Sequence, residues 1–210
     1  MNIEVFTGGP FDTNTYLLIN EQHEALVIDP TFESFDYLSY EIKEKNLNLL
    51  GILITHSHFD HIIDVAAFKK EFGSKIYIHP LDQGNLIHPG SDRLPCLETI
   101  KGVKPDHLVE DGMVIQISDF KCLVLHTPGH SFGSVCFYFK DEAKLFSGDT
   151  LFRGTYGNIS FPTSEPLKMK ASLKKLSMLP KETSVFPGHG DPTTIEQETW
   201  LNQLDEYFKN

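Results

Sequence analysis

The sequence predicts an α/β (or α+β) fold in which two β-sheets pack together between outer helices. The chain has 210 residues, 40% of them hydrophobic, which suits one sizeable core but not two full domains. Strand patterns and helix patterns alternate along it, and a succession of strands and helices occurs once in each half. Each half can therefore supply one sheet and its covering helices. We expect one domain spanning residues 1–210.

The elements of the first half follow from turn residues and apolar periodicity. Short apolar or β-branched runs between turn residues predict strands at residues 3–7, 14–19, 25–29, 50–55 and 75–79. Apolar residues at helical spacing predict one helix from Ser34 to about residue 46 and another from Ile62 to the break at Gly73.

The second half begins irregularly, because prolines and glycines interrupt residues 80–106; a helical turn followed by a surface loop is expected there. Strands are predicted at residues 113–117, 120–126, 134–139, 143–146 and 184–186. A glycine-rich loop covers residues 148–157, and an amphipathic helix covers residues 167–179. The last element is predicted to be a helix over residues 193–208, with Thr193 or Thr194 as its N-cap.

Charge and composition argue against several kinds of partner. The formal net charge is −11, so neither a nucleic-acid-binding surface nor an anionic membrane surface is expected. Cys96, Cys122 and Cys136 are odd in number and share no Cys-x-x-Cys spacing, which argues against a disulfide framework and a thiolate metal site. The N-terminal residues lack the basic and apolar regions of a signal peptide. We expect a cytoplasmic protein that acts on a small molecule.

Four candidate metal ligands follow the buried strand predicted at residues 50–55: His56, His58, Asp60 and His61. Zinc, manganese and iron accept imidazole nitrogen and carboxylate oxygen, and a hydrolytic site keeps positions open for water and substrate. Side chains at i and i+2 can point the same way, so His56 and His58 can share one ion while Asp60 and His61 reach another. Burying four such groups without a function would be costly, which favours metal binding.

Three further candidate ligands lie where a predicted strand ends in a turn. His130 and His189 each follow Pro-Gly, and Asp149 follows Ser-Gly. Each of these signals is weak alone, because Pro-Gly is first of all a tight turn. Together with the histidine-rich segment, they indicate one metal centre. The remaining histidines lack ligand spacing and are expected to be structural: His23, His79, His88, His107 and His126.

These motifs resemble those of the metallo-β-lactamase superfamily and, within it, the single-domain hydrolases of the hydroxyacylglutathione hydrolase (glyoxalase II) type. The matching segments are Thr-His-Ser-His-Phe-Asp-His at 55–61, Thr-Pro-Gly-His at 127–130, Ser-Gly-Asp-Thr-Leu-Phe at 147–152 and Phe-Pro-Gly-His-Gly at 186–190. The resemblance covers almost the whole chain. It implies a four-layer αββα sandwich with the site at one edge, between strand ends.

The resemblance also implies the ligand sets. His56, His58 and His130 would hold one metal ion, Asp60, His61 and His189 would hold a second, and Asp149 would bridge them. The implied cofactor is two divalent ions, with zinc expected and iron or manganese as substitutes. Asp29 matches a family position that braces the metal-binding loop; a simple turn carboxylate is an equally good interpretation of it.

The activity implied by the resemblance is hydrolysis of a thioester of the S-lactoylglutathione type by a hydroxide that bridges the two ions. Two adjacent cations lower the pKa of water and polarise the carbonyl, and Asp60 would orient the hydroxide and take its proton. Similar sequences include persulfide dioxygenases, which hold one iron at positions matching His56, His130 and Asp149. The same ligands would also suit hydrolysis of a lactone, lactam or other ester, or a non-catalytic binding protein stabilised by metal.

Residues around the motifs depart from the family. Ile62-Ile63 stand where the family commonly has a glycine pair, and Asn-Ile-Ser-Phe at 158–161 replaces a segment that carries basic or aromatic substrate contacts in many relatives. We therefore expect hydrolytic chemistry without an obvious glutathione site. Arg153, Tyr156 and Asn158 are the candidate substrate contacts, although Arg153 would suit a solvated surface position equally well.

Overall fold

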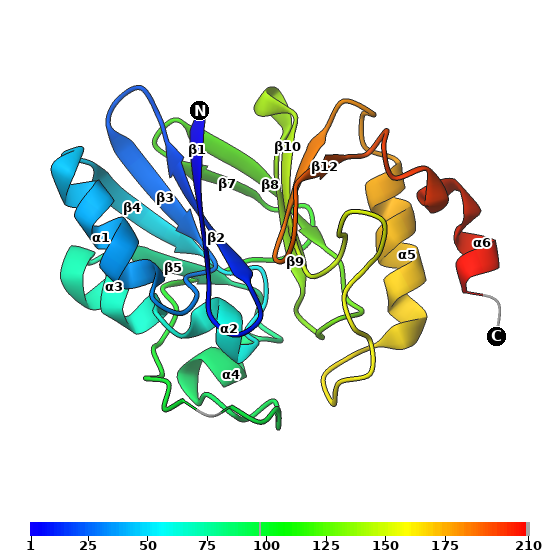
Figure 1. Ribbon diagram of the computed structural model, residues 1–210, viewed down its shortest axis with the longest axis horizontal. Helices are drawn as coiled ribbons and strands as arrows, with labels where there is room; N and C mark the ends of the chain where they lie inside the picture. Colours follow the sequence, from blue (N-terminus) through cyan, green and yellow to red (C-terminus); the bar gives the residue numbers. More distant parts are fainter. Residues whose placement is uncertain (97, 209–210) are drawn as a thin grey trace.

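Two six-stranded β-sheets lie face to face between outer helices in the computed structural model, which describes residues 1–96 and 98–208. Helices α1 (Ser34–Glu44) and α3 (Val65–Phe72) cover the outer face of one sheet. Helices α5 (Pro166–Ser177) and α6 (Leu204–Tyr207) lie on the outer side of the other sheet (Figure 1). This order of layers confirms the predicted αββα sandwich.

The first sheet is mixed. Its strand order is β1 (Asn2–Gly8), β2 (Thr13–Ile19), β3 (Glu24–Ile28), β4 (Asn48–Leu53), β5 (Lys75–Ile78) and β6 (His107–Leu108). Neighbours from β1 to β3 are antiparallel, whereas neighbours from β3 to β6 are parallel. The strands β1 to β5 were predicted from the sequence. Strand β6 was not, because two residues are too few to show an alternating pattern.

The second sheet has the order β12 (Thr193–Thr194), β11 (Ser184–Pro187), β10 (Lys144–Gly148), β9 (Val135–Phe139), β8 (Phe120–His126) and β7 (Val114–Ile117). Strands β8 and β10 run in the same direction because each is antiparallel to β9, and β11 is parallel to β10. A short 3₁₀ helix, η1 (Lys140–Glu142), connects β9 to β10. The carboxyl ends of β8, β10 and β11 therefore lie at the same edge.

The helix predicted over residues 193–208 is wrong for its first part. Thr193 and Thr194 do not cap a helix; they form β12 and pair with β11. Buried Glu198 accepts hydrogen bonds from Thr193 Oγ1 at 2.5 Å and from Trp200 Nε1 at 2.6 Å, which holds the chain in a turn. The 3₁₀ helix η2 (Thr199–Gln203) and α6 follow this turn. Helical periodicity carries no sign that Glu198 is buried, and β-branched threonines favour a strand.

The helix predicted from Ile62 to Gly73 is divided into α2 (Phe59–Ile62) and α3. Asp64 lies between them, and its carboxylate accepts a hydrogen bond from the backbone N–H of Phe35 at 2.9 Å. It thereby satisfies an amide in the first turn of α1, which has no partner within that helix. The helical turn expected after residue 80 is α4 (Gln83–Ile87).

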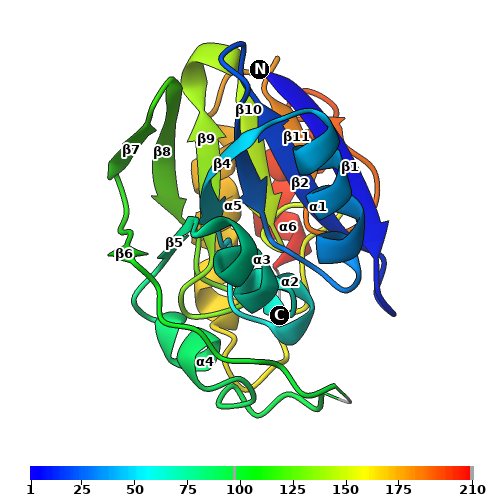
Figure 2. The same ribbon diagram turned by 90° about the vertical axis from the view of Figure 1, so that its left-hand side faces the viewer.

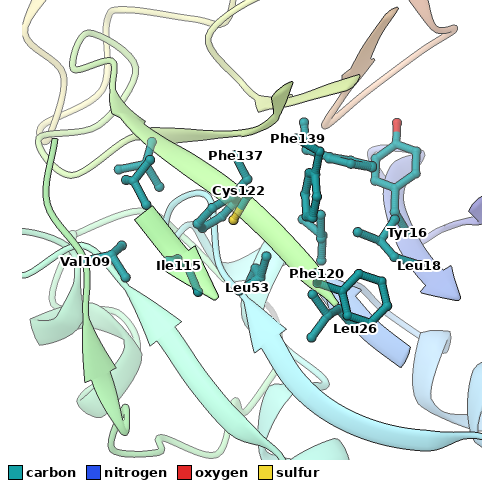
Figure 3. Close-up of a cluster of buried hydrophobic side chains, with 14 residues drawn as sticks. Tyr16, Leu18, Leu26, Leu53, Val109, Ile115, Phe120, Cys122, Phe137 and Phe139 are labelled. Carbon is teal, nitrogen blue, oxygen red and sulfur yellow. The ribbon is translucent and has the colours of Figure 1, made fainter. Parts of the chain in front are cut away.

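Strand alternation distributes the apolar side chains over three layers of packing. On β3, Leu26 and Ile28 face the second sheet, whereas Ala25 and Val27 face α1 and α3. Figure 3 shows the cluster between the sheets, in which Leu26 lies near Phe120 of β8. A third cluster fills the space between the second sheet and α5, η2 and α6.

The segments that carry the candidate ligands meet at one edge of the sandwich. Helices α2 and α4 lie at this edge, at the lower end of the molecule in Figures 1 and 2. Two backbone hydrogen bonds join the sheets there: Val135 N–H donates to Thr55 O at 2.9 Å, and Asn14 N–H donates to Gly188 O at 2.7 Å. The position of one sheet relative to the other is therefore fixed next to the site. Within the described residues, no helix combines the length and apolar character needed to cross a membrane.

Two of the histidines expected to be structural form a stacked pair between the sheets. His79 follows β5 and His126 ends β8; their ring centroids are 4.1 Å apart and their planes differ by 12°. Nδ1 of His79 accepts a hydrogen bond from the backbone N–H of Leu81 at 3.3 Å. Burial, together with the neighbouring His126, lowers the pKa of His79 to about 4. The folded protein therefore keeps this ring neutral.

Acid is expected to destabilise the fold through His79. An unfolded imidazole titrates near 6.5, so the contribution of His79 is complete above that pH and is lost as the pH falls towards about 4. The His79→Asn variant keeps an acceptor near the Nδ1 position but does not titrate. When the pH falls from about 7 to about 4.5, the free energy of unfolding should decrease by about 1 kcal/mol less in this variant than in the unmodified protein. Urea unfolding at both pH values measures this difference, with His23→Asn as the control. An unchanged pH dependence would contradict the prediction.

Candidate metal centre

Seven histidine and aspartate side chains converge where the two sheets meet. His56 and His58 lie in the loop after β4, and Asp60 and His61 lie in α2, which begins directly after His58. The short helix turns the chain, so the second pair of side chains points to a different position from the first pair. The loops that follow β8, β10 and β11 contribute the rest: His130, Asp149 and His189.

The side chains form two groups whose ligand atoms lie within 4.8 Å of one another. One group contains His56, His58 and His130, with Nε2 of His56 3.2 Å from Nε2 of His130. The other contains Asp60, His61 and His189, with Nε2 of His61 3.4 Å from Nε2 of His189. The structure thus brings together the residues expected to hold each ion.

Asp149 lies between the two groups. Its Oδ2 is 3.3 Å from Nε2 of His130 in the first group and 3.4 Å from Nε2 of His189 in the second. Its Oδ1 is 3.5 Å from Nε2 of His61. Gly188 permits this close approach, because a Cβ at that position would overlap Oδ1 of Asp149. One carboxylate therefore faces both groups.

The donor set fits divalent metal ions. Oδ1 of Asp149 is buried and has no hydrogen-bond partner among the described residues, which is costly unless a cation satisfies it. The converging atoms are imidazole nitrogens and carboxylate oxygens, the donors that zinc, iron and manganese share. The two groups and the carboxylate between them can therefore hold two ions.

Hydrogen bonds on the outer side of the imidazoles orient their inner nitrogens. Nδ1 of His130 donates to the carbonyl oxygen of Asn158 at 2.7 Å, and Nδ1 of His189 donates to that of Phe11 at 2.9 Å. Nδ1 of His61 donates to Oδ2 of Asp29 at 3.0 Å. Each Nε2 therefore faces its group, and its lone pair is available to a metal ion when the ring is neutral.

Asp29 is buried behind the ligands. Its carboxylate accepts hydrogen bonds from the backbone N–H of Thr55 at 2.7 Å, from the hydroxyl of Thr55 and from His61. Its ligand atom also lies within 4.8 Å of those of His56 and His61, but these hydrogen bonds already engage it. The geometry is that of a carboxylate that holds the loop after β4 and the ring of His61 in place.

The electrostatics of the cluster divide the imidazoles into two kinds. Burial lowers the pKa of His56 and His58 well below the usual imidazole value, so both offer lone pairs. Burial would also lower the pKa of His61, but the charges of Asp60 and Asp149 outweigh it and raise that pKa to about 10. In the metal-free protein His61 therefore carries a proton, which a metal ion must displace.

Sequence reasoning missed Asp82, which joins two of the ligand-bearing loops. Its buried carboxylate accepts hydrogen bonds from Ser57 N–H at 2.9 Å, from Ser131 Oγ at 2.9 Å and from Gly133 N–H at 2.7 Å. Ser57 lies between His56 and His58, and Ser131 follows His130. A single aspartate in an irregular segment has no spacing that could have identified it.

The Asp82→Ala variant should be less stable and bind metal more weakly. It leaves the buried donors of both loops without an acceptor, which is expected to cost about 2–4 kcal/mol. Because the loops carry ligands, metal affinity should also fall by about 10–100-fold. Urea unfolding and a metal-competition titration measure the two effects. Asp141→Ala, at an exposed position, is the matched control, and a variant that behaves like this control would refute the role of Asp82.

A second unpredicted residue, Asn14, holds the loop after β11. Its side-chain amide donates to the carbonyl oxygens of Pro187 at 3.1 Å and Gly190 at 2.9 Å. Its backbone N–H donates to Gly188 O in the same loop. These contacts set the position of His189 from a strand more than 170 residues earlier in the chain, a separation that no local motif reveals.

The candidate substrate contacts separate in space. Asn158 lines the cavity above the ligands. Arg153 does not; it is exposed and pairs with Asp191 at 3.2 Å. Tyr156 stacks on Phe208 with centroids 5.1 Å apart and packs against the cluster beneath α5 and η2. Neither Arg153 nor Tyr156 lines the cavity: the turn after β10 directs one side chain to solvent and the other to the outer core.

The cavity has a polar floor and an aromatic rim. It has a volume of about 400 Å³, and His58, Asp60, His130, Asp149 and His189 line its floor. The rim consists largely of phenylalanine side chains: Phe11, Phe59, Phe152 and Phe161. A small molecule can thus reach the converging ligands through an apolar entrance.

The remaining histidines and the cysteines stand outside this cluster. Among the described residues, no group of three or more candidate metal ligands includes His23, His79, His88, His107 or His126. Cys122 and Cys136 are buried in the core, Cys96 is half-buried, and all three thiols are free.

Comparison with known proteins identifies the family. The family model of the metallo-beta-lactamase superfamily matches residues 8–189, a range that includes every candidate ligand. Hydroxyacylglutathione hydrolase GloC of Haemophilus influenzae is 32% identical over 206 residues, which cover 96% of this chain and 97% of that protein.

Two solved structures are also similar to the chain. The crystal structure of BLEG-1 B3 metallo-beta-lactamase has a TM-score of 0.87 and 39% identity, over 94% of this chain and 96% of that one. The structure of TTHA1623 in a di-iron-bound form has a TM-score of 0.79 and 37% identity, over 93% and 96% of the two chains. Sequence and fold therefore agree: the protein is a member of the metallo-beta-lactamase superfamily.

Proposed function

We propose that this protein is a binuclear metal-dependent thioesterase of the hydroxyacylglutathione hydrolase type. One observation carries the proposal: two groups of three ligands share Asp149 on the floor of an open cavity. The similarity to a protein named hydroxyacylglutathione hydrolase supports thioester chemistry, and a di-iron relative supports two ions. The substrate would be a small molecule, and free cysteines favour a reducing compartment such as the cytoplasm.

His56, His58 and His130 would hold one ion, and Asp60, His61 and His189 the other, with Asp149 common to both. Two divalent cations at these positions supply Lewis acidity and make hydroxide available near neutral pH. Zinc is the ion we expect, and the same donors accept iron or manganese. The chain's own contribution is to hold these donors in place on the floor of a cavity with an aromatic rim.

Asp60 is the residue best placed to accept the proton of the attacking water. It lines the cavity, and Thr13 Oγ1 donates to its Oδ2 at 2.7 Å. The hydrogen bond fixes the carboxylate, so that it can orient the attacking water and accept its proton. The oxygen of that water bonds to the thioester carbon, the carbon–sulfur bond breaks, and the proton passes to the departing sulfur. The products are a carboxylic acid and a thiol.

Metal removal and replacement test the proposal. Elemental mass spectrometry of the purified protein should detect up to two equivalents of metal per chain. A chelator should abolish hydrolysis of S-lactoylglutathione and uncharged thioesters, and zinc, iron or manganese should restore it. Absence of turnover with every metal would refute the proposal. One iron per chain together with oxygen uptake on glutathione persulfide would identify a persulfide dioxygenase instead.

Hydrolysis of β-lactams is the second candidate function. It is favoured by the 39% identity and TM-score of 0.87 to BLEG-1, which is described as a B3 metallo-beta-lactamase. A chromogenic cephalosporin assayed beside the thioesters separates the two activities. A kcat/KM for the cephalosporin above that for every thioester would replace the first proposal with this one.

A further inference from the structure

A second, larger cavity adjoins the cavity above the ligands. The second cavity has a volume of about 750 Å³ and shares Phe11, Phe59 and Pro95 with the first. Phe32 lies in its wall, and Glu33 and Glu98 lie at its margin. We call this extension the aromatic groove and define it by Gly9, Pro10, Phe11, Phe32, Phe59 and Pro95. The groove is therefore next to the site, and a molecule held at the ligands can contact the rings of Phe11 and Phe59 that line both cavities.

The groove is built from segments that pack on one another. The turn between β1 and β2 lies against the loop between β3 and α1. The approach is so close that a Cβ at Gly9 would lie 2.6 Å from the ring of Phe32. Gly9 also has a φ of +73°, which favours glycine. The ring of Phe59 packs edge-on against Phe11 and Phe32, with centroids 5.6 and 6.3 Å apart. Three rings thus form one continuous apolar wall leading away from the ligands.

The charge of the groove is negative. Among the described residues that line the two cavities, no lysine or arginine occurs, whereas Glu33 and Glu98 border the groove. Glu33 is held in the left-handed conformation with a φ of 63°, which is unfavourable for a residue with a side chain. An anion in the groove would therefore face two carboxylates, and no lysine or arginine side chain among the described lining residues compensates them.

We infer that the aromatic groove binds one arm of the substrate and selects an aromatic or aliphatic arm without negative charge. The inference rests on the proposed function, since that arm flanks the carbonyl held at the ligands. Glutathione is a poor occupant, because its thioesters carry two carboxylates and one ammonium group. The favoured substrate is an uncharged apolar thioester, whose arm in the groove is either the acyl chain or the thiol.

Two series of thioesters test this preference and identify the arm. The first series keeps the lactoyl group and varies the thiol among benzyl mercaptan, N-acetylcysteamine and glutathione. The second keeps N-acetylcysteamine and varies the acyl group among acetyl, hexanoyl and phenylacetyl. In one of the series, the apolar arm should raise kcat/KM by about tenfold or more through burial against the phenylalanine rings. The comparison is benzyl mercaptan with N-acetylcysteamine in the first series, and hexanoyl or phenylacetyl with acetyl in the second. Glutathione should be the poorest thiol.

Variants of the groove test its residues. Phe11→Ala should remove most of the preference for the apolar arm, whereas Tyr40→Ala, at an exposed position on α1, should retain it. The Glu33→Gln/Glu98→Gln double variant should raise kcat/KM for the glutathione thioester by a few-fold at low ionic strength, and the gain should disappear in high salt. Glu110→Gln/Glu182→Gln, at exposed positions outside both cavities, is the matched control.

Binding provides a readout that needs no turnover. S-Benzyl-N-acetylcysteamine and S-benzylglutathione share an apolar arm and lack a scissile carbonyl. Calorimetry should show that the uncharged thioether binds more tightly than S-benzylglutathione. In the Glu33→Gln/Glu98→Gln variant, the difference between the two affinities should be smaller.

The outcomes separate this inference from the proposed function. Hydrolysis that favours glutathione, or that is indifferent to the groove variants, would overturn the inference and leave the thioesterase proposal standing. Absence of all hydrolysis would refute the thioesterase proposal, and the thioether titration would then decide the inference alone. Equal binding of the two thioethers, unchanged in the variants, would overturn it.

Discussion

The Asp149→Asn variant should lose nearly all hydrolytic activity while keeping its fold. The carboxylate of Asp149 faces both ligand groups, so it contributes to the affinity of each proposed ion. Asparagine has nearly the same shape but lacks the negative charge, and its NH₂ group cannot bind a cation. We expect metal content to fall from two equivalents to one or fewer, and kcat/KM to fall by at least about a thousandfold.

The control for this variant is Asp191→Asn. Asp191 is exposed and pairs only with Arg153 among the interactions of its side chain in the described residues, so its loss should change neither metal content nor rate. Circular dichroism should give the same spectrum for all three proteins, because neither substitution changes the shape of the side chain. Retention of two ions and full activity by Asp149→Asn would show that the carboxylate does not bridge a metal centre.

The contrast between Asp149 and Asp82 shows which parts of the site a sequence can reveal. Asp149 follows a strand and a glycine, so strand ends and turn residues identify it as a presented side chain. Asp82 joins residues separated from it by 25 to 51 positions, and its partners are backbone amides and a serine hydroxyl. Such partners leave no residue pattern in the sequence.

The same reasoning separates the predicted elements from the errors. Strand β9 has a continuous apolar pattern because both of its faces are covered, and it was predicted. The end of the chain has a helical pattern, but buried Glu198 and the pairing of Thr193–Thr194 with β11 override it. Local periodicity includes neither the pairing with β11 nor the hydrogen bond that Glu198 accepts from the backbone N–H of Gly154, 44 residues earlier.

The aromatic groove is a further feature that sequence patterns do not reveal. Phe11, Phe32 and Phe59 come from a hairpin turn, a strand-to-helix loop and a short helix. Each is an ordinary apolar residue in its own segment, and together they form one wall. The sequence motifs indicate what chemistry the site performs, whereas the choice of substrate depends on surfaces that only the fold assembles.

The Asp60→Asn variant should remain impaired even when metal is supplied in excess. Asp60 belongs to the second ligand group and is also the proposed proton acceptor, so its replacement affects both binding and chemistry. His189 belongs to the same group but has no proposed role with the proton. The Asp60→Asn and His189→Ala variants therefore separate the two contributions when their rates are measured over a range of metal concentrations.

Both variants should be nearly inactive at low metal, because each lacks one ligand of the second ion. In excess metal, His189→Ala should recover a substantial part of kcat, since the missing ligand affects occupancy. Asp60→Asn should remain about 100–1000-fold below the unmodified protein at the same occupancy, because asparagine cannot accept the proton. Equal recovery of the two variants would mean that Asp60 acts as a ligand alone. The proton must then leave through another group that lines the cavity.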